Sequence, residues 1–289
     1  MSNRLSNKEG GVGAQPSSRQ PELTRAERSA TETVSALNEL GARVQTQIAN
    51  EYPLTVYLDK RELVTLMTLG AYPELLVLGF LRNQRLVGDI ADIAAVQVDW
   101  KTEAAAVTTR DGAAPAEHSE RRTVTSGCGQ GTMFGDLMAR IDELRLSATA
   151  RLDEQTLFAL LDDVRRRDTL YKQAGAIHGC ALADAQGNII FFVEDVGRHN
   201  AVDTIAGAMW LQGMPGDDKI FYTTGRLTSE MVIKAAQMGI PILVSRSGLT
   251  AMGYRIARQV GMTLVGRAQG RHYLLFSGEE RFLGISPED

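Results

Sequence analysis

The feature that most constrains the fold is the alternation of short apolar segments with amphipathic ones in the second half of the chain. Strands alternating with helices of about ten residues are typical of βαβ units and a parallel sheet. An antiparallel hairpin precedes this run and a last strand follows it, so the sequence predicts an α/β fold with helices packed on a mixed β-sheet. The predicted elements are the hairpin strands Cys180–Ala183 and Ile189–Val193, helix Asn200–Leu211, strand Lys219–Thr223, helix Ser229–Met238, strand Ile240–Ser245, helix Thr250–Val260, and strands Met262–Val265 and Tyr273–Phe276.

The first half predicts a smaller α/β portion behind an N-terminal extension. Polar residues dominate the first twenty positions, so residues 1–46 are expected to be a flexible extension, with at most a short helix across Ala26–Leu40. The expected parts are then 47–150, an N-terminal α/β portion, and 151–289, the α/β domain described above. Further predicted elements are a strand with alternating Leu54, Val56 and Leu58, a helix opened by Pro73 and Glu74, strand Ile93–Trp100, loop Asp111–Glu120, strand Arg121–Thr125, helix Thr132–Leu144, and a helix capped by Asp153.

Charge and hydropathy exclude two classes of protein. The formal net charge is −4, whereas a dedicated nucleic-acid-binding protein usually carries a basic excess. The sequence contains no run of about 18 apolar residues, so no transmembrane helix is expected. The polar stretch at residues 1–20 lacks the apolar core of a signal peptide. We therefore expect a cytoplasmic protein that binds neither nucleic acid nor membrane.

One of the two cysteines lies in a sequence suited to chemistry. Cys128 is flanked by Gly127 and Gly129, which permit close approach to its thiol, and the predicted helix behind it would favour the thiolate. Cys180 begins an apolar run, where a free cysteine is usually buried. Two cysteines and four scattered histidines predict neither a disulfide framework nor a metal site. Local sequence alone also allows the alternative that Cys128 is a loop cysteine without any role.

A second group of polar residues lies at a strand-to-helix junction. Residues 194–200 read EDVGRHN and combine two acids with Arg198, His199 and Asn200. Asp195 or Asn200 could cap the following helix, but a cap needs one such residue, so this density indicates a site. His178 stands just before a predicted strand and is open to a purely structural role.

Arginines recur after the predicted strands. Arg198, Arg226, Arg246 and Arg267 each follow one, and the carboxyl ends of parallel strands share the edge at which α/β sheets bind ligands. Guanidinium groups at that edge suit phosphates. The segment Thr224–Ser229 adds hydroxyl groups and a helix N-terminus, which favour an anion. The pattern predicts a phosphate-binding edge, against the alternative that individual arginines are only surface residues.

Together these residues resemble the FdhD family of formate dehydrogenase accessory sulfurtransferases. The likeness spans about residues 52–276, and its densest segments are EDVGRHNAVD (194–203), TTGRLTSEMVIKAA (223–236), GIPILVSRSGLTA (239–251) and GMTLVGRAQGR (261–271). The resemblance implies a cytidine-deaminase-like three-layer core, a homodimer, and a sulfurtransferase activity. Such a protein takes sulfane sulfur from a cysteine desulfurase as a cysteine persulfide. It passes the sulfur to the molybdenum cofactor, bis-molybdopterin guanine dinucleotide, before the cofactor enters formate dehydrogenase.

The resemblance also assigns site residues. The persulfide cysteine falls on Cys128, although Gly131 stands where the family's Cys-x-x-Cys loop has its second cysteine. The family's cofactor-binding segment is one residue shorter in this chain, and Arg267 replaces a usual aromatic residue. With the arginine-lined edge, the expected cofactor-binding residues are Arg267, Ala268, Gln269, Gly270, Arg271, His272, Arg198, His199, Arg226 and Arg246. Guanosine diphosphate (GDP) is expected to bind as an analogue of the cofactor.

Three other functions compete with sulfur transfer as explanations of the sequence. A zinc nucleoside deaminase needs His-x-Glu and Pro-Cys-x-x-Cys to hold zinc and move protons, but His178 is followed by Gly179 and Cys180, and the sequence has no Cys-x-x-Cys. A chaperone that holds the molybdenum cofactor without moving sulfur is the main alternative, because of Gly131. A nucleotide-binding regulatory domain would leave the glycine-flanked Cys128 unexplained.

Overall fold

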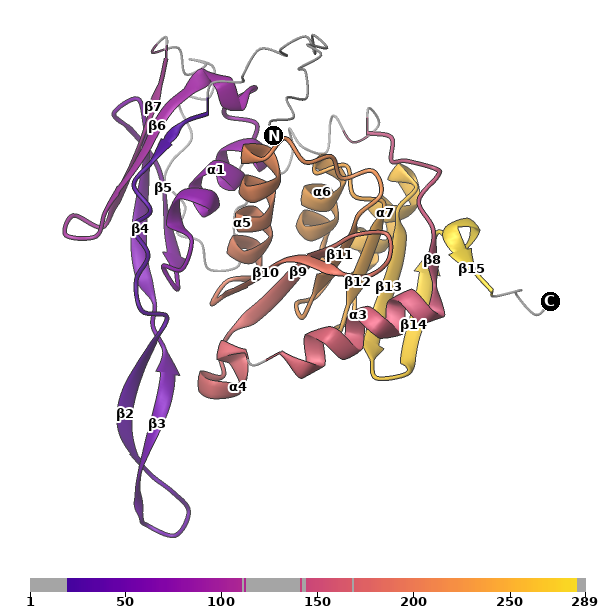
Figure 1. Ribbon diagram of the computed structural model, residues 1–289, viewed down its shortest axis with the longest axis horizontal. Coiled ribbons are helices and arrows are strands. Elements are labelled where there is room, and N and C mark those ends of the chain that lie inside the picture. The colour runs from indigo at the N-terminus through magenta and orange to yellow at the C-terminus, as the bar shows by residue number, and fades with distance from the viewer. Residues whose placement is uncertain (1–19, 111, 113–140, 142–143, 168, 285–289) are drawn as a thin grey trace, which may run out of the picture.

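Two separate sheets organise the chain (Figure 1). The computed structural model describes residues 20–110, 112, 141, 144–167 and 169–284. A five-stranded sheet has the order β1-β6-β7-β4-β5, and a six-stranded sheet has the order β10-β9-β11-β12-β13-β14. The mixed α/β class expected from the sequence is therefore confirmed. Cys128 lies outside the described residues, as do the predicted strand Arg121–Thr125 and most of loop Asp111–Glu120 and of helix Thr132–Leu144.

The second half follows the predicted order of elements closely. Strand β9 forms the expected antiparallel hairpin with β10, and Asp153 caps α3 by accepting a hydrogen bond from the backbone N–H of Thr156. The bounds are β8 Leu152–Asp153, α3 Glu154–Arg166, α4 Leu170–Ala174, β9 His178–Ala183, β10 Ile189–Asp195, α5 Arg198–Leu211, β11 Ile220–Thr223, α6 Ser229–Gln237, β12 Ile242–Ser245, α7 Ala251–Val260, β13 Thr263–Gln269, β14 His272–Ser277 and β15 Phe282–Leu283.

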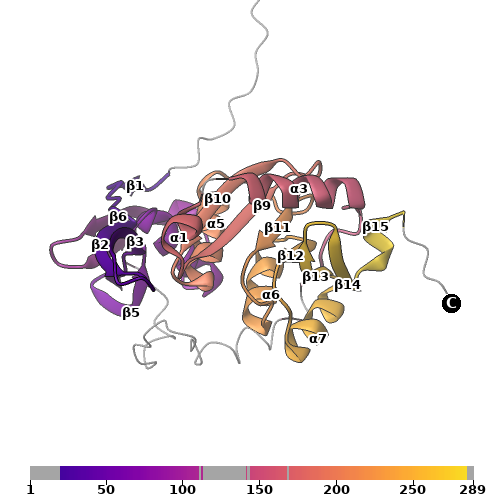
Figure 2. The same cartoon turned by 90° about the horizontal axis from the view of Figure 1, so that it is seen from below.

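The six-stranded sheet is the middle of three layers (Figure 2). Successive side chains of a strand point to opposite faces, so Phe221 of β11 packs with α5, α6 and α7, whereas Tyr222 packs on the α3 side. Both residues are buried, which explains why the inner strands read as continuous apolar runs. The structure thus buries two apolar cores against one sheet. A specific likeness to cytidine deaminases stays a prediction.

The strand directions place four loops at one edge. Strands β11, β12 and β13 are mutually parallel, and β9 is antiparallel to both β10 and β11. Strand β10 therefore runs in the same direction as β11. The carboxyl ends of β10, β11, β12 and β13 share one edge, which we call the carboxyl edge and define by the loops and helix starts that follow these strands.

The five-stranded sheet carries α1 on the face turned toward the rest of the molecule. Alternate residues Leu54, Val56 and Leu58 of β4 are buried in its core, as the sequence pattern predicts. The bounds are β1 Glu22–Leu23, β4 Tyr52–Leu58, β5 Arg61–Thr68, α1 Pro73–Asn83, β6 Ile93–Asp99 and β7 Ala104–Thr109. None of the described helices combines the length and the apolar character of a membrane span.

A close crossing of α1 and α5 joins the two halves (Figure 1). A Cβ atom built on Gly79 would lie 1.6 Å from the backbone oxygen of Asp203, and one on Gly207 would lie 1.9 Å from that of Leu75. Both distances are far inside van der Waals contact, so only glycine permits the two backbones to approach this closely. The crossing brings the start of α5, and with it the carboxyl edge, into fixed relation with the first sheet.

The N-terminal extension differs from the prediction. Instead of a helix across Ala26–Leu40, β2 (Thr31–Leu37) and β3 (Arg43–Ala49) form an antiparallel ribbon that projects from the body (Figure 1). Strand β1 pairs with β6 in the first sheet. The predicted helix is therefore wrong, and the flexibility expected for residues 1–46 stays a prediction. Thr31, Thr33 and Val34 are β-branched, and they favour the extended ribbon over a helix.

Candidate functional site

The four arginines predicted at the carboxyl edge do not occupy equivalent positions. Arg198 is the first residue of α5, Arg226 lies in the loop between β11 and α6, and Arg246 follows β12 directly. Arg267, however, lies inside β13, because this strand continues to Gln269. The prediction that Arg267 follows a strand end is wrong. A bulge in the pairing with β14 and a positive φ of 52° at Arg267 extend the strand past the expected terminus.

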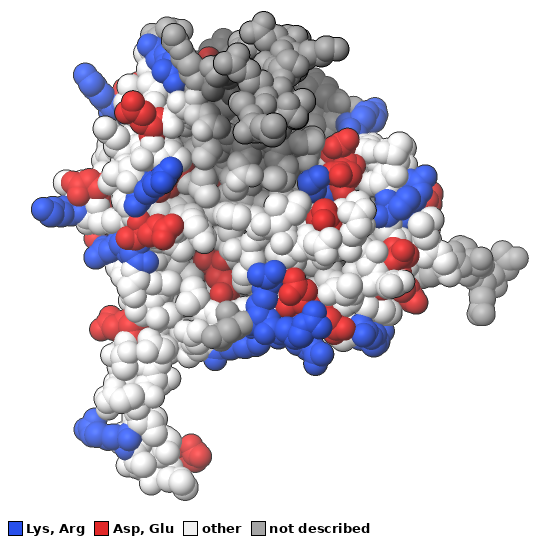
Figure 3. All heavy atoms as spheres, viewed as in Figure 1, with Lys and Arg blue, Asp and Glu red and all other residues white. Residues whose placement is uncertain are grey.

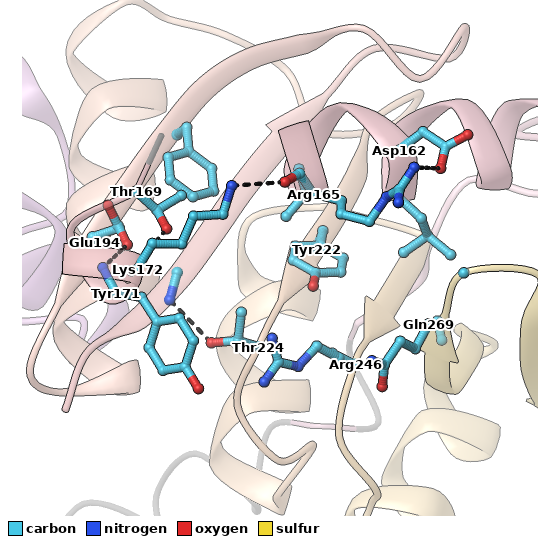
Figure 4. A pocket seen from close by; sticks show the side chains of 16 residues that line it. Asp162, Arg165, Thr169, Tyr171, Lys172, Glu194, Tyr222, Thr224, Arg246 and Gln269 are labelled. Carbon is cyan, nitrogen blue, oxygen red and sulfur yellow. Dashed lines mark hydrogen bonds and ion pairs between the residues drawn. The ribbon is translucent and has the colours of Figure 1, made fainter. Parts of the chain in front are cut away.

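A pocket of about 190 Å³ opens at this edge between the sheet and the pair α3 and α4 (Figure 4). Of the predicted cofactor-binding residues, it brings together Arg246, Ala268, Gln269 and Gly270. Arg267 lines a separate hollow beside the start of α7. The remaining predicted residues are not in the lining of either: they are Arg198, His199, Arg226, Arg271 and His272.

The walls of the pocket suit a flat, partly apolar ligand. Phe192 and Tyr222 line it together with the aliphatic side chains of Leu161 and Val164. Burial raises the pKa of Tyr222 to about 12, so its hydroxyl group keeps its proton and can donate a hydrogen bond. Aromatic faces stack on planar rings such as nucleobases. The sequence analysis missed these walls, because their side chains come from a helix and strands that meet only after folding.

The acidic groups of the pocket are already engaged. Glu194 accepts hydrogen bonds from the backbone N–H groups of Leu170 and Tyr171, at 2.7 and 3.0 Å, and so caps α4. Asp162 lies 3.5 Å from Arg165 and 3.0 Å from Arg271. These contacts leave the carboxylates partly neutralised, so they do not oppose an anionic ligand with full charge.

Basic groups around the pocket form a patch along the lower edge of the molecule (Figure 3). Arg165 and Lys172 line the pocket, and the Arg246 guanidinium lies 5.6 Å from the centroid of the Tyr171 ring. Within the described ranges, no acidic side chain forms an ion pair with Arg246. The run Arg165–Arg167 at the end of α3 was the one sequence signal that could have indicated this patch.

A second basic cluster adjoins the pocket at the starts of α5 and α6. Burial lowers the pKa of His178, and the charges of Arg198 and Arg226 lower it further, so these three side chains lie close together. Neither helix N-terminus has a side-chain cap, which leaves backbone N–H groups for an anion. Gly179 and Thr224 exchange two hydrogen bonds, at 2.9 and 3.0 Å, and link the cluster to the pocket. The helix starts at Arg198 instead of Asn200, so Asn200 does not cap it.

Asp195 instead holds the junction between the two halves. Its carboxylate accepts hydrogen bonds from the Thr68 hydroxyl group at 2.6 Å, the Leu69 N–H at 3.2 Å, the Gly197 N–H at 2.9 Å and the Asn200 amide at 2.9 Å. Thr68 is the last residue of β5 in the first sheet, and Leu69 follows it. Burial raises the pKa of Asp195 to about 6, although the four hydrogen bonds oppose this shift. The role of Asp195 in the structure is therefore to clamp the start of α5.

This raised pKa predicts a pH dependence of stability. Between about pH 4 and pH 6 the folded state binds more protons at Asp195 than the unfolded state does, so the free energy of unfolding should fall as pH rises through this window. Asp195→Asn removes the titration, and its stability relative to wild type should therefore improve from pH 4 to pH 6. Urea unfolding across this range measures the difference, with exposed Asp217→Asn as control. A wild-type-to-variant difference that is constant or grows with pH would contradict this assignment.

Cys180 is unsuited to nucleophilic chemistry. It is fully buried in β9, its thiol lies 3.3 Å from the Thr223 hydroxyl group, and burial raises its pKa to about 12. The thiolate is the reactive form, and this site holds the thiol protonated. Cys180 is therefore a core residue.

Comparison with known proteins places the chain among relatives of one kind. The model of the FdhD/NarQ family matches residues 49–283. A protein of Listeria monocytogenes named sulfur carrier protein FdhD is 31% identical over 241 residues, which cover 82% of this chain and 92% of the relative. A Xanthomonas axonopodis protein of the same name is 31% identical over 251 residues, 85% of this chain and 89% of the relative.

A solved structure agrees with these relatives. The crystal structure described as a formate dehydrogenase accessory protein from Desulfotalea psychrophila superposes with a TM-score of 0.69 at 27% identity. The match covers 88% of this chain and 99% of that one. The matched family region contains the six-stranded sheet, strands β4 to β7 of the five-stranded sheet, the pocket and the carboxyl edge. The chain belongs to the FdhD/NarQ family.

Proposed function

We propose that this protein is a sulfur carrier that matures formate dehydrogenase. It takes sulfane sulfur from a cysteine desulfurase as a persulfide on Cys128 and delivers it to bis-molybdopterin guanine dinucleotide, its bound substrate. The names of the relatives, sulfur carrier and formate dehydrogenase accessory protein, support this role. On this proposal the protein is a cytoplasmic sulfurtransferase that acts as a homodimer.

The observation that carries the proposal is the burial of the other cysteine. A persulfide carrier needs a thiol that a partner's sulfur can reach and that ionises near neutral pH. The chain has two cysteines, and Cys180 is fully buried with a pKa of about 12. Sulfur chemistry therefore falls to Cys128, whose glycine-flanked sequence suits close approach.

The loading step balances as an exchange between a thiolate and a persulfide. The Cys128 thiolate attacks the terminal sulfur of the desulfurase persulfide, so that a sulfur–sulfur bond forms on Cys128 as the bond in the donor breaks. The desulfurase cysteine leaves as a thiolate, and no external oxidant or reductant enters this step. A single cysteine suffices for it, so Gly131 does not prevent loading.

The pocket and the basic cluster suit the guanine dinucleotide part of the substrate. A planar base fits between the aromatic and aliphatic walls, and Arg246 with the two uncapped helix N-termini can hold phosphates. Ala268, Gln269 and Gly270 line the pocket where the family resemblance places cofactor binding.

Intact mass spectrometry after incubation with a cysteine desulfurase and cysteine tests sulfur transfer directly. The sulfur-carrier proposal expects one added sulfur atom that a reducing agent removes. A chaperone that binds the cofactor without moving sulfur expects no adduct.

GDP should bind at the pocket, and its affinity should fall as salt increases. Phosphate contacts near the surface are screened by ions, and a charge-assisted hydrogen bond contributes about 1.5–3 kcal/mol, so Arg246→Leu should weaken binding about tenfold or more. Titration calorimetry measures both effects. Arg255→Leu, an exposed arginine of α7, is the matched control. Equal weakening by both variants, or no binding to the folded protein at low salt, would refute the site.

A further inference from the structure

A chain of buried polar side chains leads from the α1–α5 crossing to His199 at the carboxyl edge. Asn83 of α1 donates a hydrogen bond to Asp203 at 2.7 Å, and the Lys234 ammonium lies 2.7 Å from the other oxygen of Asp203. Lys234 Nζ also lies 3.7 Å from Glu230 Oε1, and Glu230 Oε2 lies 3.2 Å from His199 Nε2. Neither the phosphate-binding edge nor the thiol chemistry uses this network.

The inner end of the network lies out of reach of water. The Lys234 side chain is 0% exposed and that of Asp203 1%, whereas His199 and Glu230 are 13% and 21% exposed at the outer end. Buried charges are tolerated when they are paired, and the desolvation cost of these charges is considerable. Apolar residues alone could hold these helices together. A chain of charged residues that ends at a histidine therefore indicates that it sets the protonation state of that histidine.

Charge balance decides the state of the imidazole ring. Two carboxylates, Asp203 and Glu230, face two cations, Lys234 and Arg198, whose charges act on Glu230. The cluster is then neutral only when His199 is neutral. Burial, followed by the charges of Lys234, Arg198 and His178, lowers the pKa of His199 to about 2.

A neutral imidazole carries one proton, and its neighbour selects the nitrogen that holds it. Nε2 is buried and makes no aligned hydrogen bond within the described residues, but it lies 3.2 Å from Glu230 Oε2, and a carboxylate oxygen accepts hydrogen bonds and repels a nitrogen lone pair. Burial raises the pKa of Glu230, and Lys234, placed on its far oxygen, opposes this shift and favours the ionised carboxylate over a carboxylic acid that would donate to Nε2. The arrangement therefore puts the proton on Nε2 and leaves the lone pair on Nδ1.

We propose that Glu230, supported by Lys234 and Asp203, is a positioning residue that holds His199 as the neutral tautomer with its proton on Nε2. His199 follows Arg198 at the start of α5, beside the basic cluster. The role of this tautomer, which rests on the proposed function, is to offer Nδ1 as a hydrogen-bond acceptor where sulfur is delivered. A neutral acceptor can take a hydrogen bond from the S–H group of a thiol or persulfide without adding a competing anion to the phosphate-binding edge.

Nuclear magnetic resonance of protein labelled with ¹⁵N-histidine tests the tautomer directly. The chain has four histidines, which single His→Gln replacements assign. The ¹⁵N shifts distinguish a protonated ring nitrogen from an unprotonated one. Wild-type His199 should show protonated Nε2 and unprotonated Nδ1 throughout about pH 5–8, the range in which an ordinary histidine titrates. A proton on Nδ1, or titration within this range, would overturn the proposal.

Two variants of Glu230 separate positioning from packing. Glu230→Gln keeps an acceptor oxygen and should preserve both the tautomer and most of the formate dehydrogenase maturation. Glu230→Leu removes the acceptor, so His199 should populate both tautomers and maturation should fall about tenfold, the scale of one lost hydrogen bond. Exposed Glu279→Leu is the control. An unchanged tautomer or full maturation in folded Glu230→Leu would overturn the proposal, and should this variant not fold, the wild-type spectrum and Glu230→Gln still decide. If the proposed function itself is wrong, the wild-type protein will show no sulfur adduct, a result that is independent of the His199 tautomer.

Discussion

Cys128→Ala is expected to abolish both the sulfur adduct and the maturation of formate dehydrogenase while the protein stays folded. The replacement removes the atom that anchors the persulfide, and Cys180 cannot take over, because it is fully buried with a thiol pKa of about 12. Formate dehydrogenase activity in a strain that lacks its own carrier should therefore drop to background. The mass of the variant should not change after incubation with a cysteine desulfurase.

Cys180→Ala is the matched control for this experiment. It deletes a buried sulfur atom and its contact with Thr223, and the cost should be of the order of 1 kcal/mol in the free energy of unfolding. Loading and maturation should persist in this variant. Full activity of Cys128→Ala would refute the carrier, and loss of the adduct with retained maturation would favour the cofactor-holding chaperone.

Gly207→Ala should be among the most destabilising single substitutions in the chain. On an isolated helix the change would stabilise by about 1 kcal/mol, because alanine has the higher helix propensity. In α5, however, the new methyl group would lie 1.9 Å from the backbone oxygen of Leu75 and 2.9 Å from the Gly79 nitrogen. Backbone atoms cannot rotate away, so α1 and α5 must separate. We expect a loss of about 3 kcal/mol or more, since overpacking outweighs propensity.

Urea unfolding measures this loss, and Gly88→Ala is a suitable control. A Cβ atom on Gly88 meets nothing within 4 Å, and its φ is not positive, so this change should alter stability little. The separation of the helices should also displace Asn83 from Asp203 and weaken the network that leads to His199. A Gly207→Ala protein as stable as wild type would show that the crossing is not as close as the structure describes.

The sequence by itself determined most elements of the second half and their order, but not α4 or the short strands β8 and β15. Apolar periodicity is a local property, so strands β9 to β12 and helices α3, α5, α6 and α7 begin and end within a few residues of the prediction. The parallel order of these strands follows from their alternation with helices, and it placed Arg198, Arg226 and Arg246 at one edge. The density of polar groups in residues 194–200 also marked a true junction of the fold.

Only the tertiary structure decided how these residues act. Asp195 is a clamp because Thr68, 127 positions away, donates to it, and Glu230 faces His199 only because α5 and α6 pack side by side. The pocket walls come from α3, α4 and the sheet. Arg267 lies outside the pocket because β13 continues through a bulge past its predicted end. Periodicity specifies which face of an element is buried but not which element packs against that face. Contacts between distant segments are set by close packing, such as the approach of α1 and α5 that Gly79 and Gly207 permit.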